Sequence, residues 1–285
     1  MITSFNNKAV RDVMQLNQKA KARNKQGVFV AEGVKMFAEA PTDRIEKVYI
    51  AQRMEGKLQE QYADKLGRLS CEIVADEIFD KMADTKTPQG VLCLVRQFHY
   101  NMEDMLAGKY RRSVGGKHIV INSSAVSEHG NKNQMLFIVL EDMQDPGNLG
   151  TVFRTGEGAG VDGIIMSSRT ADVYNPKTIR STMGSVYRVP FLYAEDLCGA
   201  IRAMQKRDIN VYAAHLKKSK RYDTYDYCAG TAFLIGNESA GLSGETAQCA
   251  DAYLKIPMEG QVESLNAAVA SSILLYEAYR QRSSR

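Results

Sequence analysis

The chain has 285 residues, of which 25% are charged and 44% hydrophobic, and its formal net charge is +4 at pH 7. This composition is typical of a water-soluble globular protein, and the length favours two domains over one large one. No apolar run is long enough to span a membrane, and the first 27 residues lack the hydrophobic stretch of a secretory signal. The five cysteines form no CxxC pair and the four histidines are scattered. These observations argue against a metal site and a disulfide framework, and they favour a reducing cytosol.

Positive charge gathers at the start of the chain. The first 25 residues hold one acidic residue, Asp12, and six basic ones, which are Lys8, Arg11, Lys19, Lys21, Arg23 and Lys25. Basic side chains neutralise phosphates, so this segment is a candidate surface for a polyanion such as nucleic acid. A solvated helix face would show the same pattern, and charge alone does not separate the two interpretations.

The N-terminal part alternates between helical and strand patterns. Apolar residues at helical spacing predict a helix over 7–23, and short apolar runs predict strands at 28–31, 48–51, 72–74 and 91–95. Helices are expected over 34–40, 54–67 and 77–82, the last of them capped by Asp76. This alternation predicts a small α/β domain over residues 1–100.

A less regular stretch follows. One short helix is predicted over 102–106 and one short strand over 118–122, in a setting of glycine and polar residues. We therefore assign 101–133 to a linker with an insertion and 134–285 to a second α/β domain. In that domain we expect strands at 136–140, 163–166, 211–214, 232–235 and 252–256, and helices at 148–158, 176–183, within 240–249 and at 265–282.

The glycines of residues 158–163 match the GxGxxG pattern of dinucleotide-binding proteins. That pattern requires the glycines to follow a strand and to begin a helix, whose backbone N–H groups then face the pyrophosphate. Here the predicted order is reversed, with the helix first. The glycines are therefore expected to end a helix and turn into a strand, and a nicotinamide oxidoreductase has no other support in the sequence.

Three predicted strands of the second domain run into loops that carry polar residues. The first loop leads through Asn148 to Arg154, the second contains Gly236 and Glu238, and the third precedes a helix headed by Ser264 and Asn266. Taken singly, these residues could be helix caps, turn residues and a surface ion pair. Because open α/β sheets bind ligands at the carboxyl ends of their strands, we expect the three loops to line one crevice.

These loops resemble the three signature motifs of the SpoU/TrmH class of RNA ribose 2'-O-methyltransferases, in the SPOUT superfamily. The matching runs are DPGNLGTVFRT (145–155), FLIGNESAGLS (233–243) and IPMEGQVESLNAAVASSILLYE (256–277), with NPKTIRSTMGS (175–185) between the first two. The N-terminal half resembles the family's L30e-like substrate-binding domain through FVAEG (29–33) and TPQGV (87–91). The resemblance covers nearly the whole chain except about 111–133.

The resemblance implies an α/β C-terminal domain whose last segments thread a trefoil knot, with S-adenosylmethionine as cofactor. It further implies a homodimer that acts on RNA, with ribosomal RNA favoured over transfer RNA. The cysteine and histidine pattern adds the expectation of a cytoplasmic protein without metal. Matched by position, the cofactor contacts are Gly236, Ile256 and Leu265, and the catalytic group comprises Arg154, Asn148, Glu238, Ser264 and Asn266.

A ribose 2'-hydroxyl is a poor nucleophile until it loses its proton. A guanidinium stays protonated, so we expect Arg154 to stabilise the developing alkoxide and an adjacent phosphate, and not to act as a base. Proton acceptance by Glu238 or by water is left open.

The basic N-terminal segment would hold the RNA, while Lys217, Lys218, Lys220 and Arg221 are better explained as solvated surface charge. The alternative function is a non-catalytic RNA-binding protein of the same fold, against which the intact motif residues argue.

Overall fold

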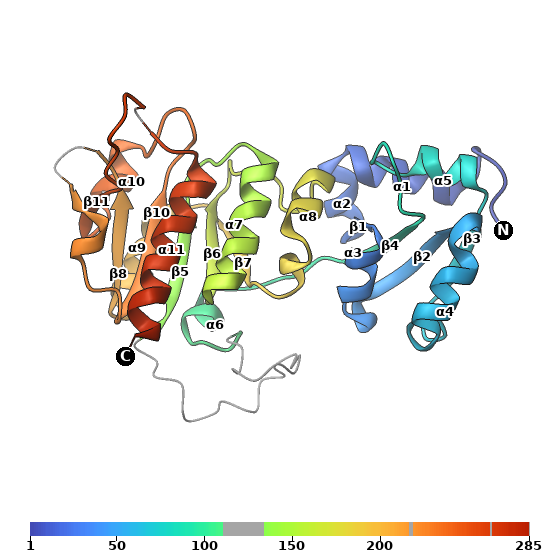
Figure 1. Ribbon diagram of the computed structural model, residues 1–285, viewed down its shortest axis with the longest axis horizontal. Coiled ribbons are helices and arrows are strands. Elements are labelled where there is room, and N and C mark those ends of the chain that lie inside the picture. Colours follow the sequence, from blue (N-terminus) through green and yellow to red (C-terminus); the bar gives the residue numbers. More distant parts are fainter. Residues whose placement is uncertain (111–133, 217–218, 263, 285) are drawn as a thin grey trace. The chain divides into compact units, whose positions relative to one another are not determined.

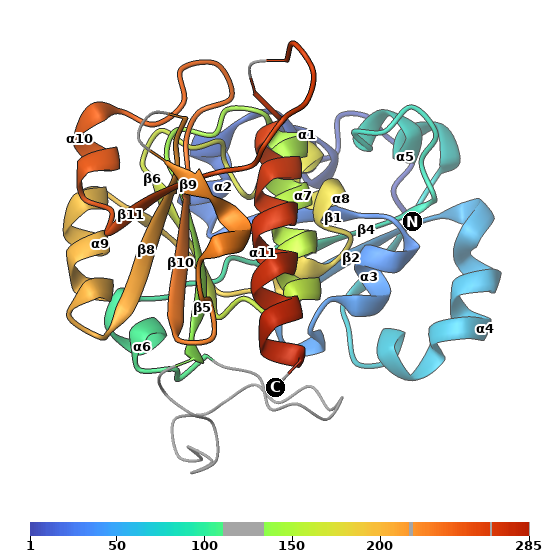
Figure 2. The same ribbon diagram turned by 60° about the vertical axis from the view of Figure 1, so that its left-hand side comes forward.

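The computed structural model describes residues 1–110, 134–216, 219–262 and 264–284. Contacts divide the chain into two compact units, Met1–Phe98 with Asp172–Tyr187, and His99–Ala171 with Arg188–Arg285. Each unit has its own sheet (Figures 1 and 2), which confirms the predicted α/β class. The domain limits predicted at 100 and 134 stay a prediction, because 111–133, with the strand expected at 118–122, lies outside the described residues.

The first unit is built on a four-stranded sheet in the order β1-β4-β2-β3. Strands β1 and β2 run antiparallel to β4, and β3 runs parallel to β2. The strands are β1 (Val28–Glu32), β2 (Ile45–Ala51), β3 (Cys71–Val74) and β4 (Val91–Arg96). The helices are α1 (Lys8–Gln18), α2 (Ala20–Gln26), α3 (Val34–Glu39), α4 (Glu55–Leu66), α5 (Asp76–Met82) and α8 (Pro176–Thr182).

Successive side chains of β1 point to opposite faces of the sheet, and both faces are packed with apolar residues. Val28 and Val30 of β1 pack in one cluster with Val10 and Val13 of α1. Between them, Phe29 faces the other way and stacks on Tyr174 with ring centroids 4.7 Å apart. Burying apolar side chains on both faces of the sheet stabilises a unit of this size.

Residues 172–187 belong to the first unit by their contacts, although they follow strand β6 (Gly163–Ser167) of the second unit in sequence. The Tyr174 hydroxyl accepts a hydrogen bond from the Phe98 backbone N–H (2.7 Å). The Asp172 carboxylate pairs with the Arg23 guanidinium at 2.5 Å. The sequence pattern did not predict that this segment packs with the N-terminal strands.

Arg23 does not belong to the basic surface that the sequence predicts. Its side chain is only 3% exposed and donates to the Leu16 carbonyl oxygen as well as to Asp172. The predicted helix 7–23 breaks at Lys19, which has an extended backbone. The break turns Arg23 inward while Lys19, Lys21 and Lys25 stay exposed.

The second unit is built on a seven-stranded parallel sheet in the order β7-β6-β5-β10-β8-β11-β9. Its strands are β5 (Leu136–Leu140), β6 (Gly163–Ser167), β7 (Phe191–Ala194), β8 (Ile209–Ala214), β9 (Lys220–Arg221), β10 (Gly230–Ile235) and β11 (Ala252–Lys255). Its helices are α6 (Met102–Leu106), α7 (Pro146–Ala159), α9 (Leu197–Gln205), α10 (Gly244–Gln248) and α11 (Ala267–Ser283).

Helices cover both faces of this sheet, as its fully buried central strands require. Phe137 and Val139 of β5 pack with Leu197 and Ile201 of α9 on one face. On the other face α7 and α11 lie side by side (Figures 1 and 2). Within the described residues, none of the helices has the length and apolar character needed to cross a membrane.

Several predicted boundaries shift in the structure. Helix α7 begins at Pro146 and is capped by Asp145, whose side chain accepts from the Asn148 N–H, so Asn148 lies inside the first turn. Helix α11 is capped by Asn266, and Ser264 lies before the helix. Asp76 is the first residue of α5, not its cap, and its carboxylate accepts from the Arg53 N–H.

Residues 184–210 received no assignment from the sequence, yet they contain β7 and α9. The signal for α9 was present, because Asp196 caps the helix and its buried side chains recur at helical spacing. Strand β7 is a four-residue edge strand with a weak pattern. The prediction for the GxGxxG run is confirmed, because α7 ends at Ala159, Gly160 has a left-handed backbone (φ +77°) and β6 starts at Gly163.

The expectation that the cysteines form no disulfide is wrong for one pair. Cys198 in α9 and Cys249, which follows α10, form a disulfide with Cα atoms 6.0 Å apart. They are separated by 51 residues, so only the packing of α10 beside α9 brings them together. Cys71, Cys93 and Cys228 take part in no disulfide. The inference of a reducing compartment from cysteine usage loses part of its support.

Candidate active site

A cavity of about 410 Å³ opens at the carboxyl ends of β8, β10 and β11. Three segments line it, namely 214–216 after β8, 235–242 after β10, and 254–258 with Ser264 and the start of α11. These strands are neighbours in the parallel sheet, so their loops meet at one edge, where open α/β sheets bind ligands. The expectation that all three motif loops line one crevice is wrong for the first loop, because no residue from Glu141 to Thr155 lines this cavity.

The three residues expected to contact the cofactor, Gly236, Ile256 and Leu265, all line this cavity. At Gly236 a side chain is excluded by space, because an added Cβ would collide with the backbone of Gly241 and Leu242. The loop closes on itself at this point, and the N–H and C=O groups of Asn237 and Gly241 bond reciprocally at 3.0 Å. Glycine at 236 therefore brings two backbone segments into direct contact along the cavity wall.

Three of the residues expected to be catalytic are joined by hydrogen bonds. The Asn148 side-chain amide donates to Glu238 Oε1 (3.1 Å), and the Asn266 side-chain amide donates to Asn148 Oδ1 (3.0 Å). Each residue comes from a different segment of the chain. The structure therefore brings together one residue from each of the three segments that the sequence singled out.

Glu238 accepts further hydrogen bonds from the backbone N–H groups of Gln144 (3.1 Å) and Asp145 (3.2 Å). Burial alone would raise the pKa of the Glu238 carboxyl, but the bonds from Asn148 and from this backbone outweigh it and hold that pKa below the ordinary glutamate value. Glu238 is therefore ionised at neutral pH and is a poor proton acceptor.

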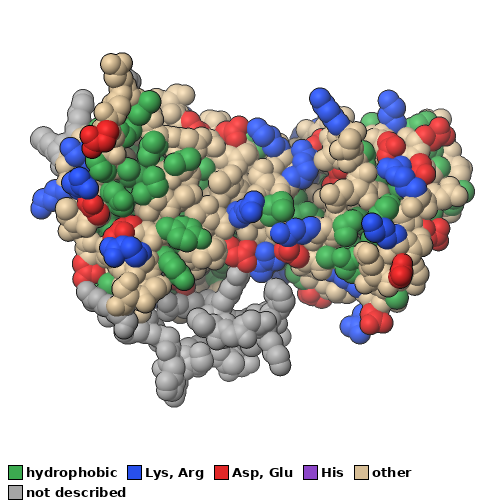
Figure 3. Space-filling view, viewed as in Figure 1, with side chains coloured by type: hydrophobic (Ala, Val, Ile, Leu, Met, Phe, Trp, Pro, Cys, Tyr) green, Lys and Arg blue, Asp and Glu red, His purple; other side chains and the backbone are tan. Residues whose placement is uncertain are grey.

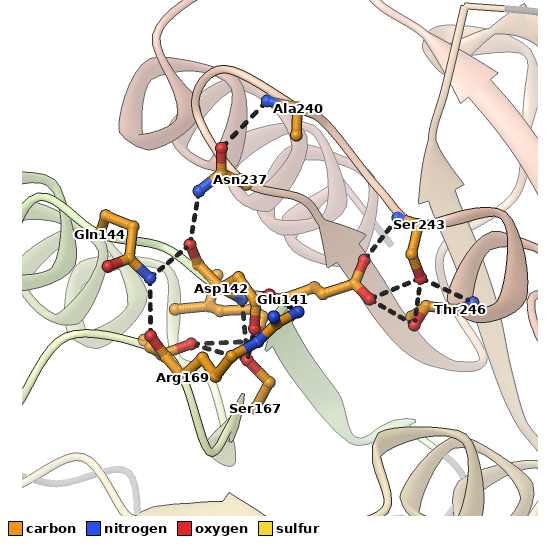
Figure 4. A network of polar contacts seen from close by, with 11 residues as sticks. Glu141, Asp142, Gln144, Ser167, Arg169, Asn237, Ala240, Ser243 and Thr246 are labelled. Atoms are coloured by element: carbon orange, nitrogen blue, oxygen red, sulfur yellow. Dashed lines mark hydrogen bonds and ion pairs between the residues drawn. The ribbon is translucent and has the colours of Figure 1, made fainter.

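The loop after β10 is also tied to the loop after β5 through Asn237 (Figure 4). Its side-chain amide donates to the Asp142 carbonyl oxygen (2.7 Å), while its Oδ1 accepts from the N–H groups of Ser239 and Ala240. Asp142 has a left-handed backbone (φ +54°), which is uncommon for a residue other than glycine. Its side chain accepts from Ser167 Oγ (2.6 Å), which links β6 to the same turn.

Sequence reasoning missed this second layer of residues. Glu141 accepts hydrogen bonds from the N–H and Oγ of Ser243 (2.8 and 2.7 Å) and from Thr246 Oγ1 (2.5 Å), so it holds the start of α10. Polar residues directly after an apolar strand were the available signal for Glu141 and Asp142. Nothing in the sequence showed which loop each of them would bind.

The remaining two predicted residues lie apart from this cluster. Ser264 is exposed and lines the cavity. Arg154 is exposed on the outer surface of α7 and is not among the residues that line the cavity. It makes no hydrogen bond or ion pair with any residue of the described chain. Likewise, the described ranges contain no group of three or more His, Cys, Asp or Glu side chains arranged to hold a metal ion.

Comparison with known proteins places the chain in a family. The SpoU rRNA Methylase family model matches residues 135–276, and that of the MRM3-like substrate binding domain matches residues 7–93. A crystal structure of AdoMet-bound rRNA methyltransferase from Sinorhizobium meliloti is similar over 98% of this chain and 97% of its own, with 31% identity and a TM-score of 0.78. The chain belongs to the SpoU rRNA methylase family.

Two further relatives are similar over nearly their full length. RlmP of Bacillus subtilis (strain 168), named 23S rRNA (guanosine(2553)-2'-O)-methyltransferase, is 28% identical over 276 residues, which are 96% of this chain and 97% of RlmP. The SpoU methyltransferase AviRb from Streptomyces viridochromogenes is 23% identical and shares the fold, with a TM-score of 0.77. The resemblance stated from the three motifs is therefore confirmed, as is a substrate-binding domain before the SpoU domain.

A substitution at Gly236 tests whether the cavity of this SpoU methylase is the cofactor site. Because Gly236→Ala would force the loop 236–242 apart, we expect it to weaken binding of S-adenosylmethionine by at least about ten-fold. Isothermal titration calorimetry measures the change. Gly244→Ala is the matched control, because a Cβ there meets no atom within 4 Å. Equal affinity of the two variants would show that the cofactor binds elsewhere.

Proposed function

We propose that this protein transfers a methyl group from S-adenosylmethionine to a ribose 2'-hydroxyl of ribosomal RNA. The observation that carries the proposal is the meeting of the second and third motif loops at one cavity. Glu238 of that lining is hydrogen-bonded to Asn148 of the first motif, and Asn148 is hydrogen-bonded to Asn266 of the third. The names of RlmP and of the Sinorhizobium meliloti enzyme support the reaction and the substrate class.

The cavity suits the cofactor in size and chemistry. Its volume of about 410 Å³ lies within the range of small-molecule sites. Ile256 and Leu265 supply apolar walls, and Gly236 lets the loop 236–242 close on itself along the cavity wall. These residues would hold S-adenosylmethionine, which supplies an activated methyl group on a sulfonium.

We assign to Arg154 the role of stabilising the negative charge that develops during methyl transfer. The 2'-oxygen gains charge as its bond to the methyl carbon forms, and a guanidinium can donate hydrogen bonds to that oxygen and to a neighbouring phosphate. Its exposed place on α7 leaves it accessible to an RNA chain. Because arginine stays protonated, it serves as an electrostatic clamp and not as the base.

Glu238 is assigned to orientation. Its ionised carboxylate holds the Asn148 amide, and Asn148 in turn accepts from Asn266. This leaves the amide groups in one defined arrangement at the rim of the cavity. With its pKa lowered, Glu238 is unsuited to take the proton of the 2'-hydroxyl, so we assign that proton to water.

Methyl transfer tests the function and the role of Arg154 together. The purified protein is incubated with labelled S-adenosylmethionine and total unmodified RNA, and ribose methylation is mapped. We expect Arg154→Ala to lower kcat by about 10²-fold or more, since it removes a transition-state contact. Arg154→Lys keeps the charge but loses the fork, so we expect it to stay well below the wild type.

Arg207→Ala, at an exposed arginine of the same unit, is the control and should retain full activity. A near wild-type rate for Arg154→Lys would remove the clamp assignment. If label appears only in transfer RNA, then transfer RNA replaces ribosomal RNA as the proposed substrate. RNA binding without any methyl transfer would favour the non-catalytic alternative.

We propose that the first unit holds the RNA. The match to a substrate-binding domain over 7–93 supports this role, as do the exposed side chains of Lys19, Lys21 and Lys25 on and beside α2. Arg23 is excluded from this surface by its burial. Of the second basic cluster, Lys217 and Lys218 lie outside the described residues, and Arg221 is paired with Asp223.

Replacing Lys19, Lys21 and Lys25 together by alanine should weaken RNA binding and reduce its salt dependence. Each lost phosphate contact lowers the slope of log affinity against log salt by about 0.7, so three give roughly two. Filter binding across a salt series measures this slope. The double variant Lys206→Ala, Arg207→Ala in the other unit should leave it unchanged. An unaltered slope in the triple variant would show that these lysines do not contact RNA phosphates.

We propose that the enzyme is a homodimer. Helix α11 exposes Val269, Tyr276 and Tyr279 at 47%, 49% and 47%, and green hydrophobic side chains are visible over this helix in Figure 3. An apolar stripe of this kind favours a second copy as its cover. Arg154 lies on the neighbouring helix α7, so a partner on this face would reach it.

We also propose that the last segments of the chain form a trefoil knot and that the protein is cytoplasmic. After β11 the chain returns across β8 to α11, which contacts β10 and α7, and both this return segment and the loop 235–242 line one cavity. We assign the threading of the knot to this return segment. The cytoplasm is assigned because the proposed substrate is ribosomal RNA.

Sedimentation velocity tests the dimer. We expect the wild type to sediment as a dimer and the double variant Val269→Asp, Tyr279→Asp to sediment as a monomer, because charge on the stripe prevents its burial. Phe5→Asp, at an exposed phenylalanine of the first unit, should remain dimeric. A monomeric wild type at assay concentrations would contradict the proposal.

A further inference from the structure

A second cavity, of about 390 Å³, lies on the other side of the loop that walls the cofactor cavity. Asn237, Ala240, Gly241 and Leu242 line both cavities. The second one is completed by polar residues of the loops after β5 and β6, which are Glu141, Asp142, Gln144 and Arg169. None of the roles assigned to the motif residues above uses this cavity.

Most polar groups of this lining are already engaged with one another (Figure 4). Glu141 is bound by Ser243 and Thr246. The Gln144 side-chain amide donates to the carbonyl oxygens of Asp142 (3.2 Å) and Arg169 (2.7 Å). The walls are therefore held in place before any ligand arrives, which reduces the entropic cost of binding.

Arg169 is the exception among them. Its Nη2 pairs with Asp142 Oδ2 at 2.5 Å, yet its side chain is 80% exposed. A guanidinium has five N–H donors in a planar fork, so one ion pair orients it and leaves the others directed to solvent. Its own backbone carbonyl is bound by Gln144, so the position of the loop does not depend on the side chain.

The charge of the lining indicates the class of ligand. Two carboxylates, Glu141 and Asp142, face one guanidinium, Arg169, so the cavity disfavours a phosphate. Guanidinium, carboxylate and amide groups are the side chains that pair with the edges of nucleobases, and a guanidinium plane also stacks on a base. A neutral, planar nucleobase fits this lining better than the RNA backbone does.

We propose that this cavity is a nucleobase subsite, in which Arg169 binds a base of the RNA strand whose ribose is methylated. The inference rests on the proposed function, because the shared loop 237–242 would then separate the cofactor from the base. Arg169 is a specificity-determining residue for RNA and takes no part in methyl transfer itself.

The test compares the full-length wild type with Arg169→Ala and Arg169→Lys in methyl transfer to an unmodified large-subunit ribosomal RNA transcript. Loss of a base contact should raise KM for RNA about ten-fold in Arg169→Ala, with little recovery in Arg169→Lys, because lysine lacks the planar fork. Arg202→Ala is the matched control, since Arg202 is exposed and paired with Asp196 in the same unit. The affinity for S-adenosylmethionine, the melting temperature and the salt slope of RNA binding should not change.

Three results would overturn the subsite. An unchanged KM for RNA would show that Arg169 does not contact it. A salt slope shallower by about 0.7 would show a phosphate contact in place of a base. A parallel loss of cofactor affinity would show that Arg169 only supports the loop. If the wild type transfers no methyl group, the proposed function fails, whereas the subsite stands or falls on whether Arg169→Ala weakens RNA in filter binding.

Discussion

The loop after β10 and the loop after β5 hold each other through hydrogen bonds in both directions. Asn237 donates to the Asp142 carbonyl oxygen, and Glu238 accepts from the Asn148 amide and from the backbone of Gln144 and Asp145. Each bond contributes only about 1 kcal/mol, or somewhat more where a carboxylate is involved. Their importance is geometric, because these bonds fix the loop that walls both cavities and carries one of the proposed catalytic residues.

These hydrogen bonds explain why a carboxylate, that of Glu238, lies just after the end of the apolar strand β10. A buried or half-buried carboxylate is costly unless donors surround it. Glu238 has three donors from one loop, which lower its pKa and make it a stable anchor. Because the same hydrogen bonds lower its pKa, Glu238 is a poor base. The division of labour in the site therefore follows from local hydrogen bonding, with anchoring by Glu238 and charge stabilisation assigned to the exposed Arg154.

Much of the fold was predictable because its signals are local. Buried parallel strands such as β5 read as continuous apolar runs, and Gly160 ends α7 because it takes up the left-handed backbone that a helix end requires. The incorrect predictions concern features that depend on a residue's position along a helix or on contacts between residues far apart in the sequence. Asp145 caps α7 three residues before the predicted start. Arg23 looked like its exposed neighbours, but a break at Lys19 turned it to Asp172.

The sequence by itself determined the family, the α/β class and the residues of the three motif loops, because these are properties of short runs and their order. Only the tertiary structure decided that Asn148, Glu238 and Asn266 are hydrogen-bonded while Arg154 stands apart. It also decided that Cys198 and Cys249 are paired, and that Asp142 and Arg169 border a second cavity. These relations join residues far apart in the chain, and the packing of neighbouring strands sets their distances.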